Sequence, residues 1–245
     1  MADFRMKIAG RVAAVTSLFE STRDYCRAYL TEEEADFSAV ITRADLDFEQ
    51  EALRQEAIEE GMKVRKFTDP FLDRAAIQRK FAEYLFHDGV LLFHGSTVAV
   101  DGRAYLFTAA CGTGKSTHTR LWLQVFGDRA VMVNDDKPFL RITDHGVLAC
   151  GAPWSGKHGL DSNITVPLAG ICILERGPEN RIRPVGPAEA MPRLLHEACA
   201  PLDSGKADAF RALVEDLTQK TPLWSMECTK DPQAAQVAFT AMSGA

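Results

Sequence analysis

The sequence lacks the long apolar run that a membrane-spanning helix requires. Such a helix takes about 18 or more consecutive apolar residues, and no segment of this chain approaches that length. The first residues, Met1–Lys7, also lack the apolar core of a signal peptide. We therefore expect a cytoplasmic protein with no membrane partner.

The chain also lacks an excess of basic residues and any paired cysteine motif. It carries 28 Lys and Arg against 34 Asp and Glu, a formal net charge of −6. A nucleic-acid-binding surface needs a basic stripe, so we expect no nucleic-acid partner. The six cysteines are scattered without a Cys-x-x-Cys spacing, which argues against a zinc site and against a disulfide framework.

What the chain does contain is a glycine-rich pattern typical of phosphate-binding loops. The segment reads Ala110-Cys111-Gly112-Thr113-Gly114-Lys115-Ser116-Thr117. In such loops backbone N–H groups cradle phosphates, the lysine reaches the outer phosphates, and the following hydroxyl ligates Mg²⁺. A strand-like run ends at Thr108 and a helical segment runs from Lys115 to about Phe126, which would point a helix N-terminus at the anion. One departure is Ala109, where the general pattern has glycine.

An acidic pair, Asp135-Asp136, closes the strand-like run Ala130–Asn134. We expect this strand to lie beside the strand that leads into the loop. A phosphoryl-transfer site needs carboxylates there, one to hold Mg²⁺ and one to accept the proton of the attacking hydroxyl. The alternative is a solvated turn at the end of a strand.

The order of these motifs resembles a known family. His94-Gly95-Ser96 precedes a hairpin across Asp101-Gly102, and the loop and the acidic pair follow. This order is similar to the catalytic domain of HPr kinase/phosphorylase, a bacterial serine kinase related in fold to phosphoenolpyruvate carboxykinase, over roughly residues 90–176. The resemblance implies an ATP- and Mg²⁺-dependent kinase in which Asp135 is the base, assisted by His94, and Asp136 and Ser116 hold the metal. Because HPr kinases form oligomers, it also implies that this chain could form a homo-oligomer.

The sequence departs from that family in ways that leave the acceptor open. Thr117 stands where HPr kinases usually carry Glu, and no segment resembles the signature used for their reverse, phosphorolytic reaction. We therefore expect a hydroxyl acceptor, either a serine of a protein or peptide or a small molecule. In the loop 151–163, Lys157 could stabilise the transferred phosphoryl group, and Trp154 could face the acceptor or the nucleotide. An ordinary surface loop with a solvated lysine is the alternative.

The whole chain is predicted to be α/β, with a mixed sheet in a P-loop kinase core. We expect a small N-terminal α/β subdomain over residues 1–88, with a strand at Met6–Val15 and a helix at Ser17–Tyr29, and the kinase domain over residues 89–245. Hairpins at 97–106 and 139–150 predict antiparallel pairs within the sheet, and Leu168–Leu174 is typical of a buried central strand. The alternative function is a nucleotide-binding regulatory module with slow ATP hydrolysis.

Overall fold

The structure, a computed structural model, describes residues 1–59 and 61–244. The chain forms two compact units, Met1–Tyr84 and Leu85–Ala245. The sequence-based boundary at residue 88 was placed just after a helix, whereas this division falls inside it, in α3 (Asp69–Phe86).

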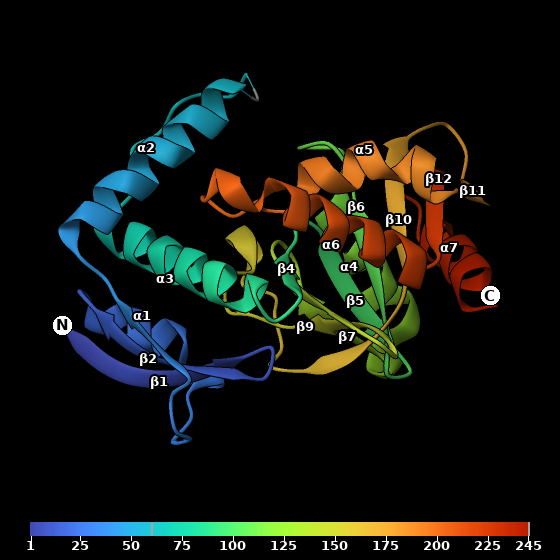
Figure 1. Cartoon of the computed structure of the whole chain (residues 1–245). Coiled ribbons are helices and arrows are strands. Elements are labelled where there is room, and N and C mark those ends of the chain that lie inside the picture. Colours follow the sequence, from blue (N-terminus) through green and yellow to red (C-terminus); the bar gives the residue numbers. More distant parts are fainter. Residues whose placement is uncertain (60, 245) are drawn as a thin grey trace. The chain divides into compact units, whose positions relative to one another are not determined.

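The N-terminal unit is a three-stranded sheet with helices (Figure 1). Strands β1 and β2 pair antiparallel, and β2 pairs parallel with β3. Its elements are β1 (Ala2–Ile8), β2 (Arg11–Ser17), α1 (Glu20–Tyr25), a 3₁₀ turn (Arg27–Tyr29), β3 (Phe37–Val40), α2 (Arg43–Glu59) and α3.

Two expectations for this unit were wrong. The single strand expected over Met6–Val15 is interrupted by a tight turn, because Ala9 and Gly10 both have positive φ, 49° and 82°. Two such residues in succession make the two-residue turn that fits the twist of a hairpin, so the chain reverses there. The helix expected over Ser17–Tyr29 is the much shorter α1, followed by the 3₁₀ turn.

A buried carboxyl group ties α3 to the start of the N-terminal unit. Asp73, fully buried, accepts hydrogen bonds from the hydroxyls of Ser17 and Thr22, both at 2.7 Å, and from the backbone N–H of Leu18 at 2.9 Å. Buried polar groups are tolerated when they are hydrogen-bonded in this way. Asp73 therefore joins β2, α1 and α3.

The C-terminal unit is built on a mixed sheet, as the sequence predicts. Strands β4, β8, β9, β10, β6, β5 and β7 follow one another across the sheet, with β12 and β11 added beside β10. The strands are β4 (Val90–Leu92), β5 (Ser96–Val100), β6 (Arg103–Thr108), β7 (Ala130–Asn134), β8 (Phe139–Thr143), β9 (Gly146–Cys150), β10 (Thr165–Arg176), β11 (Arg181–Pro184) and β12 (Leu223–Cys228). The helices are α4 (Lys115–Phe126), α5 (Pro187–Glu197), α6 (Ala207–Lys220) and α7 (Gln233–Ser243), with 3₁₀ turns at Gly127–Arg129, Gly156–His158 and Ser204–Lys206.

The strand before the acidic pair does not lie beside the strand before the loop, as we had expected. Strand β5 lies between them and pairs antiparallel with both β6 and β7. The reason is the tight turn at Asp101-Gly102, where both residues have positive φ. This turn pairs β5 with β6 as a hairpin, so that β7 pairs with the other side of β5. Since β7 is antiparallel to β5, it still runs parallel to β6.

Two hydrophobic clusters fill the two faces of this sheet. On one face, Leu106 and Ile171 pack with Leu194 of α5 and Val214 of α6; on the other, Phe107 packs with Trp122 of α4 and the alanines of α7. Helices α5 and α6 therefore cover one face, and α4 and α7 the other (Figure 1). Among the described residues, no helix combines the length and the apolar character needed to cross a bilayer.

Replacing Asp73 with Asn should destabilise the N-terminal unit. An Asn side chain offers one acceptor oxygen in place of two and turns an N–H toward a donor, so buried hydrogen-bonding groups lose partners at a cost of about 1–3 kcal/mol. Native-state hydrogen exchange of peptides from β1 and β2 measures the loss. Asp24→Asn, at an exposed position of α1, is the control and should change stability by less than about 0.5 kcal/mol; equal effects of the two would contradict the role given to Asp73.

Candidate functional site

The predicted site residues meet at one edge of the C-terminal sheet. Strands β6 and β7 both end at this edge, β6 leading into the glycine-rich loop and β7 into Asp135-Asp136. Strand β5 runs the opposite way and begins there, directly after His94-Gly95. The backbone N–H of Gly95 donates to the carbonyl of Asp136 at 2.9 Å. The inserted strand thus brings all three motifs together.

The glycine-rich loop has a backbone shape that glycine alone adopts without strain. Gly112 and Gly114 have φ of 73° and 127°, a region that costs other residues a steric penalty. The N–H of Thr113 closes a turn onto the carbonyl of Ala110 at 3.2 Å. Helix α4 then begins at Lys115, with Gly114 at its N-cap and no side chain bonded there. An uncapped N-terminus of a helix this long suits a phosphate.

Lys115 lies folded along the loop, and its neighbour Ala109 has a structural part. The Lys115 ammonium donates to the carbonyl of Ala109 at 2.9 Å, and Ala109 itself is buried. Ser116 and Thr117 are half-buried in the first turn of α4, and Cys111 is exposed. Ala109, which stands where the general loop pattern has glycine, therefore contributes the carbonyl that binds Lys115.

Asp135 is buried and linked to the helix that follows the loop. One carboxylate oxygen accepts from the hydroxyl of Ser96 at 2.7 Å, and that hydroxyl lies 2.7 Å from the hydroxyl of Thr119 on α4. Asp135 is only 5% exposed. The contacts therefore connect a buried carboxylate, through Ser96, to Thr119 of α4.

Asn134 holds the acidic pair in place. Its side-chain oxygen accepts from the backbone N–H of Asp136 at 2.9 Å and of Lys137 at 2.7 Å. Its amide nitrogen donates to the carbonyl of Ala152 at 2.7 Å. An Asn that bonds to its own backbone two residues on stabilises a tight turn, so the orientation of Asp136 is set by this turn and by the loop 151–163 behind it.

His94 lies beside Asp136 and not beside Asp135, the residue it was expected to assist. Its Nε2 is 3.6 Å from a carboxylate oxygen of Asp136, and its Nδ1 is 3.0 Å from a carboxylate oxygen of Glu197 on α5. The Asp136 side chain is 37% exposed, whereas Asp135 is buried against Ser96. Of the two carboxylates, Asp136 is the one with an imidazole next to it.

Glu197 is a site residue that the sequence analysis missed. Its second carboxylate oxygen accepts from Arg193 at 3.1 Å, so each oxygen has a partner although the side chain is only 3% exposed. Burial by itself raises the pKa of Glu197, but the hydrogen bond and charge of His94, the charge of Lys115 and the hydrogen bond from Arg193 outweigh it and lower the pKa below its ordinary value. Glu197 therefore stays ionised beside the loop lysine.

In the loop 151–163, one candidate residue, Trp154, is buried and the other, Lys157, is exposed. Trp154 is 6% exposed and packs edge-on against Phe139 with ring centroids 6.4 Å apart, so it faces the interior and not an acceptor. Gly156, with φ of 68°, lies so close to Asp136 that a Cβ there would be 3.1 Å from the Cβ of Asp136. Lys157 follows it and is exposed. Lys157 is thus exposed and follows, in the chain, the glycine that lies against Asp136.

His118 is a buried residue of α4 and belongs to the core. Its Nε2 accepts from the indole N–H of Trp122 at 3.1 Å. Burial lowers the pKa of His118 to about 4, so the ring is neutral at physiological pH. We assign it a packing role beneath the loop.

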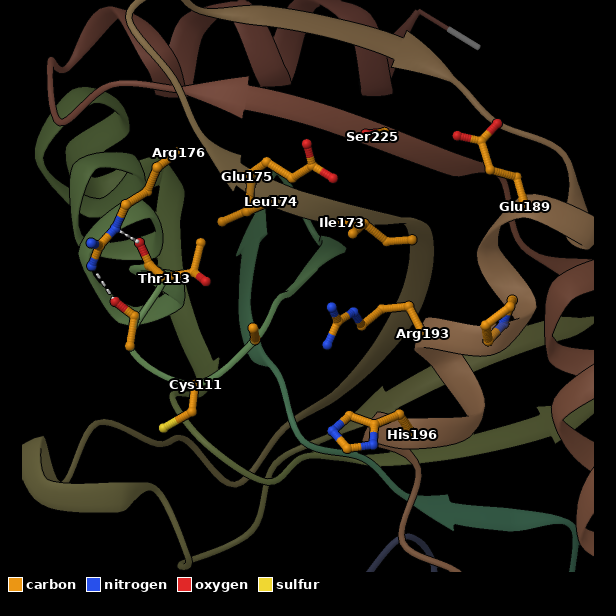
Figure 2. Close-up of a pocket in the computed structure, with 13 residues that line it drawn as sticks. Cys111, Thr113, Ile173, Leu174, Glu175, Arg176, Glu189, Arg193, His196 and Ser225 are labelled. Carbon is orange, nitrogen blue, oxygen red and sulfur yellow. Dashed lines mark hydrogen bonds between the residues drawn. The ribbon is translucent and has the colours of Figure 1, made fainter. Parts of the chain in front are cut away.

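A cavity of about 1120 Å³ opens beside the start of the loop (Figure 2). Its walls are the loop segment 110–113, the last residues of β10 and one face of α5. Arg193 and His196 project from α5 toward the loop across this space (Figure 2). Neither residue was predicted from the sequence, because nothing in the amphipathic pattern of α5 distinguishes them from ordinary surface residues.

Comparison with known proteins adds a likeness in fold. No family model matches the chain, and no curated protein is similar to it in sequence. Among solved structures, the chain is similar to the Hpr(Ser) kinase/phosphatase from Coxiella burnetii, with 10% identity and a TM-score of 0.37, over 62% of this chain and 97% of that one. At a TM-score of 0.37 this likeness carries no argument about fold, activity or substrate.

Replacing Glu197 with Gln should destabilise the C-terminal unit at pH values above the ordinary pKa of a glutamate. The change removes the charge that His94 and Arg193 face, at an expected cost of about 1–3 kcal/mol in unfolding free energy. Because the folded-state pKa of Glu197 is lowered, its stabilising effect is present above the ordinary pKa of a glutamate and is lost as pH falls through the folded value. The difference between wild type and variant should therefore shrink in acid.

Glu215→Gln is the matched control for that comparison. Glu215 accepts from Arg211 at 3.1 Å across one helical turn, the same spacing and distance as Glu197 with Arg193, but its side chain is 50% exposed. Exposed pairs of this kind contribute about 0.3–0.5 kcal/mol. Urea unfolding at several pH values measures both variants, and a Glu197→Gln effect no larger than that of the control would contradict the buried role.

Proposed function

We propose that this protein is a Mg²⁺-dependent phosphotransferase that moves the γ-phosphoryl group of ATP to a hydroxyl acceptor. The observation that carries the proposal is the single sheet edge shared by an uncapped helix N-terminus with its loop lysine, a pair of carboxylates and an imidazole. A phosphate loop alone supports nucleotide binding; the addition of two carboxylates with different surroundings supports transfer.

The loop and the first turn of α4 hold the nucleotide in this proposal. Backbone N–H groups of the loop and of the first turn of α4, other than that of Thr113, face the phosphates, and Lys115 moves from the carbonyl of Ala109 to the β- and γ-phosphates. Among the described residues, no group of three or more His, Cys, Asp or Glu side chains is arranged to hold a metal. Mg²⁺ commonly takes one or two protein oxygens together with nucleotide phosphates, and the hydroxyl of Ser116 and a carboxylate fit that donor set. When bound, the ion neutralises charge on the β- and γ-phosphates.

The contacts favour an exchange of the two aspartate roles. The resemblance gives the base role to Asp135 and the metal to Asp136. In the structure the exposed carboxylate with an imidazole beside it is Asp136, while Asp135 is buried and joined through Ser96 and Thr119 to the helix that carries Ser116. We therefore assign the base role to Asp136, supported by His94, and the metal to Asp135 and Ser116.

In the reaction, the acceptor hydroxyl loses its proton to the Asp136 carboxylate as its oxygen forms a bond to the γ-phosphorus. The bond from that phosphorus to the oxygen bridging to the β-phosphate breaks, and ADP leaves. Charge on the equatorial oxygens must be stabilised by a cation. Lys157 was the sequence-based candidate, and Arg193, which lines the cavity beside the loop and is held by Glu197, is a second.

The two aspartate assignments give opposite results in a phosphate-transfer assay. Protein, Mg²⁺ and γ-labelled ATP are offered a panel of HPr-like proteins, serine peptides, free serine and threonine, and sugars. We expect Asp136→Asn to keep Mg-ATP binding and to lower transfer by about 10²–10⁴-fold, the usual contribution of a general base. Asp135→Asn should instead weaken the dependence of nucleotide affinity on Mg²⁺. The reverse pattern would restore the base role to Asp135.

Lys115→Met is the reference variant in that assay, since loss of the loop lysine should reduce nucleotide affinity and turnover together. The rate of ATP hydrolysis without an acceptor separates a kinase from a regulatory module, because a kinase shields its γ-phosphate from water until the acceptor arrives. Nucleotide binding with no labelled acceptor in the panel would favour the regulatory module. Absence of any nucleotide binding by the wild type would overturn the proposed function.

A further inference from the structure

The phosphate loop is held from outside by one arginine on a neighbouring strand. Arg176, the last residue of β10, donates from Nε to the carbonyl of Thr113 at 3.1 Å and from Nη2 to the carbonyl of Gly112. Both hydrogen bonds are drawn in Figure 2, where the guanidinium lies beside the loop. The two donors are therefore directed at carbonyl oxygens of the loop.

These two bonds set the orientation of two successive peptide groups. In a planar trans peptide the C=O and the N–H point in opposite directions. Binding the carbonyl of Thr113 to Arg176 therefore turns the N–H of Gly114 away from Arg176. Binding the carbonyl of Gly112 turns the N–H of Thr113 toward the carbonyl of Ala110, to which it donates at 3.2 Å.

Arg176 is mounted on a rigid part of the fold. Its backbone lies in register with Cys228 of β12, and the N–H of Gly177 donates to the Cys228 carbonyl at 3.3 Å. Three residues earlier, Ile173 pairs with Thr108, the last residue before the loop. The end of β10, which is paired with β6 and β12, therefore carries the two donor groups of Arg176. The loop itself contains Gly112 and Gly114, and glycine can adopt many other backbone conformations.

We propose that Arg176 is a positioning residue that holds the phosphate loop in its binding shape before the nucleotide arrives. The planar fork of a guanidinium can bind two carbonyls at once, which a lysine ammonium cannot do with the same geometry. Without Arg176 the loop would have to be ordered by the nucleotide itself, and that cost would appear as lost affinity. The inference rests on the proposed function only for its second measurement.

The first measurement is hydrogen exchange of the full chain without nucleotide, in wild type, Arg176→Gln, Arg176→Lys and Arg181→Gln. Arg181 is the matched control, because it lies on β11 of the same sheet, is exposed, and donates to the carboxylate of Glu179 at 3.1 Å. We expect peptides covering residues 109–117 to exchange about tenfold faster in Arg176→Gln, less so in Arg176→Lys, and unchanged in Arg181→Gln. Unchanged exchange in Arg176→Gln would overturn the inference.

The second measurement is the affinity for Mg-ADP and Mg-ATP by titration calorimetry. We expect Arg176→Gln to weaken both by about tenfold, with partial recovery in Arg176→Lys and wild-type affinity in Arg181→Gln. Faster loop exchange with unchanged affinity would also overturn the inference, because ordering the loop would then not serve binding. A wild type that binds neither nucleotide would overturn the proposed function, and loop exchange alone would then decide the role of Arg176.

Discussion

The candidate site depends on the insertion of β5 between β6 and β7. A strand that runs against both of its neighbours starts where they end, so the residues before β5 meet the loop after β6 and the carboxylates after β7. If β6 and β7 were direct neighbours, β5 would not lie between them and would not bring His94 to this edge. The tight turn at Asp101-Gly102 is thus the local feature from which the long-range geometry follows.

Each buried carboxylate at this edge of the sheet has its own hydrogen-bonding or charged partners. Glu197 and Asp135 are both almost fully buried, and burial of a carboxylate is costly unless it is paired or hydrogen-bonded. Glu197 meets the guanidinium of Arg193 and the imidazole of His94, whereas Asp135 meets the Ser96 hydroxyl. Glu197 also connects α5 to the site, because the same carboxylate contacts His94 beside the acidic pair and Arg193 beside the cavity. The helix on one face of the sheet therefore bears directly on the groups at its edge.

The sequence predicts the parts of this site that are local in the chain. The loop, its strand and helix, the acidic pair and the two hairpins are short patterns whose physics is contained within a few residues, and the mixed sheet follows from them. The hairpin turn at Ala9-Gly10 was missed because Ala-Gly is a weaker signal than Asn-Gly or Asp-Gly. Glu197 could not be found, and the bonds of Arg176 to the loop could not be foreseen, since each residue contacts a partner far away in the chain that only the sheet order brings near. Trp154 was misjudged because nothing local distinguishes an aromatic side chain that packs inward from one that faces a ligand.

Two kinds of group shape the loop, and they act on opposite sides of it. Lys115 and the N-terminus of α4 present positive charge toward the side where phosphates would lie, while Arg176 takes up carbonyl oxygens on the other side. An arginine aimed at the phosphate would compete with Lys115 for the same oxygens, whereas Arg176 donates to carbonyl oxygens of the loop and leaves those phosphate oxygens to Lys115. The second arrangement leaves the loop lysine as the mobile cation, bonded to the Ala109 carbonyl and able to exchange that neutral acceptor for a charged one.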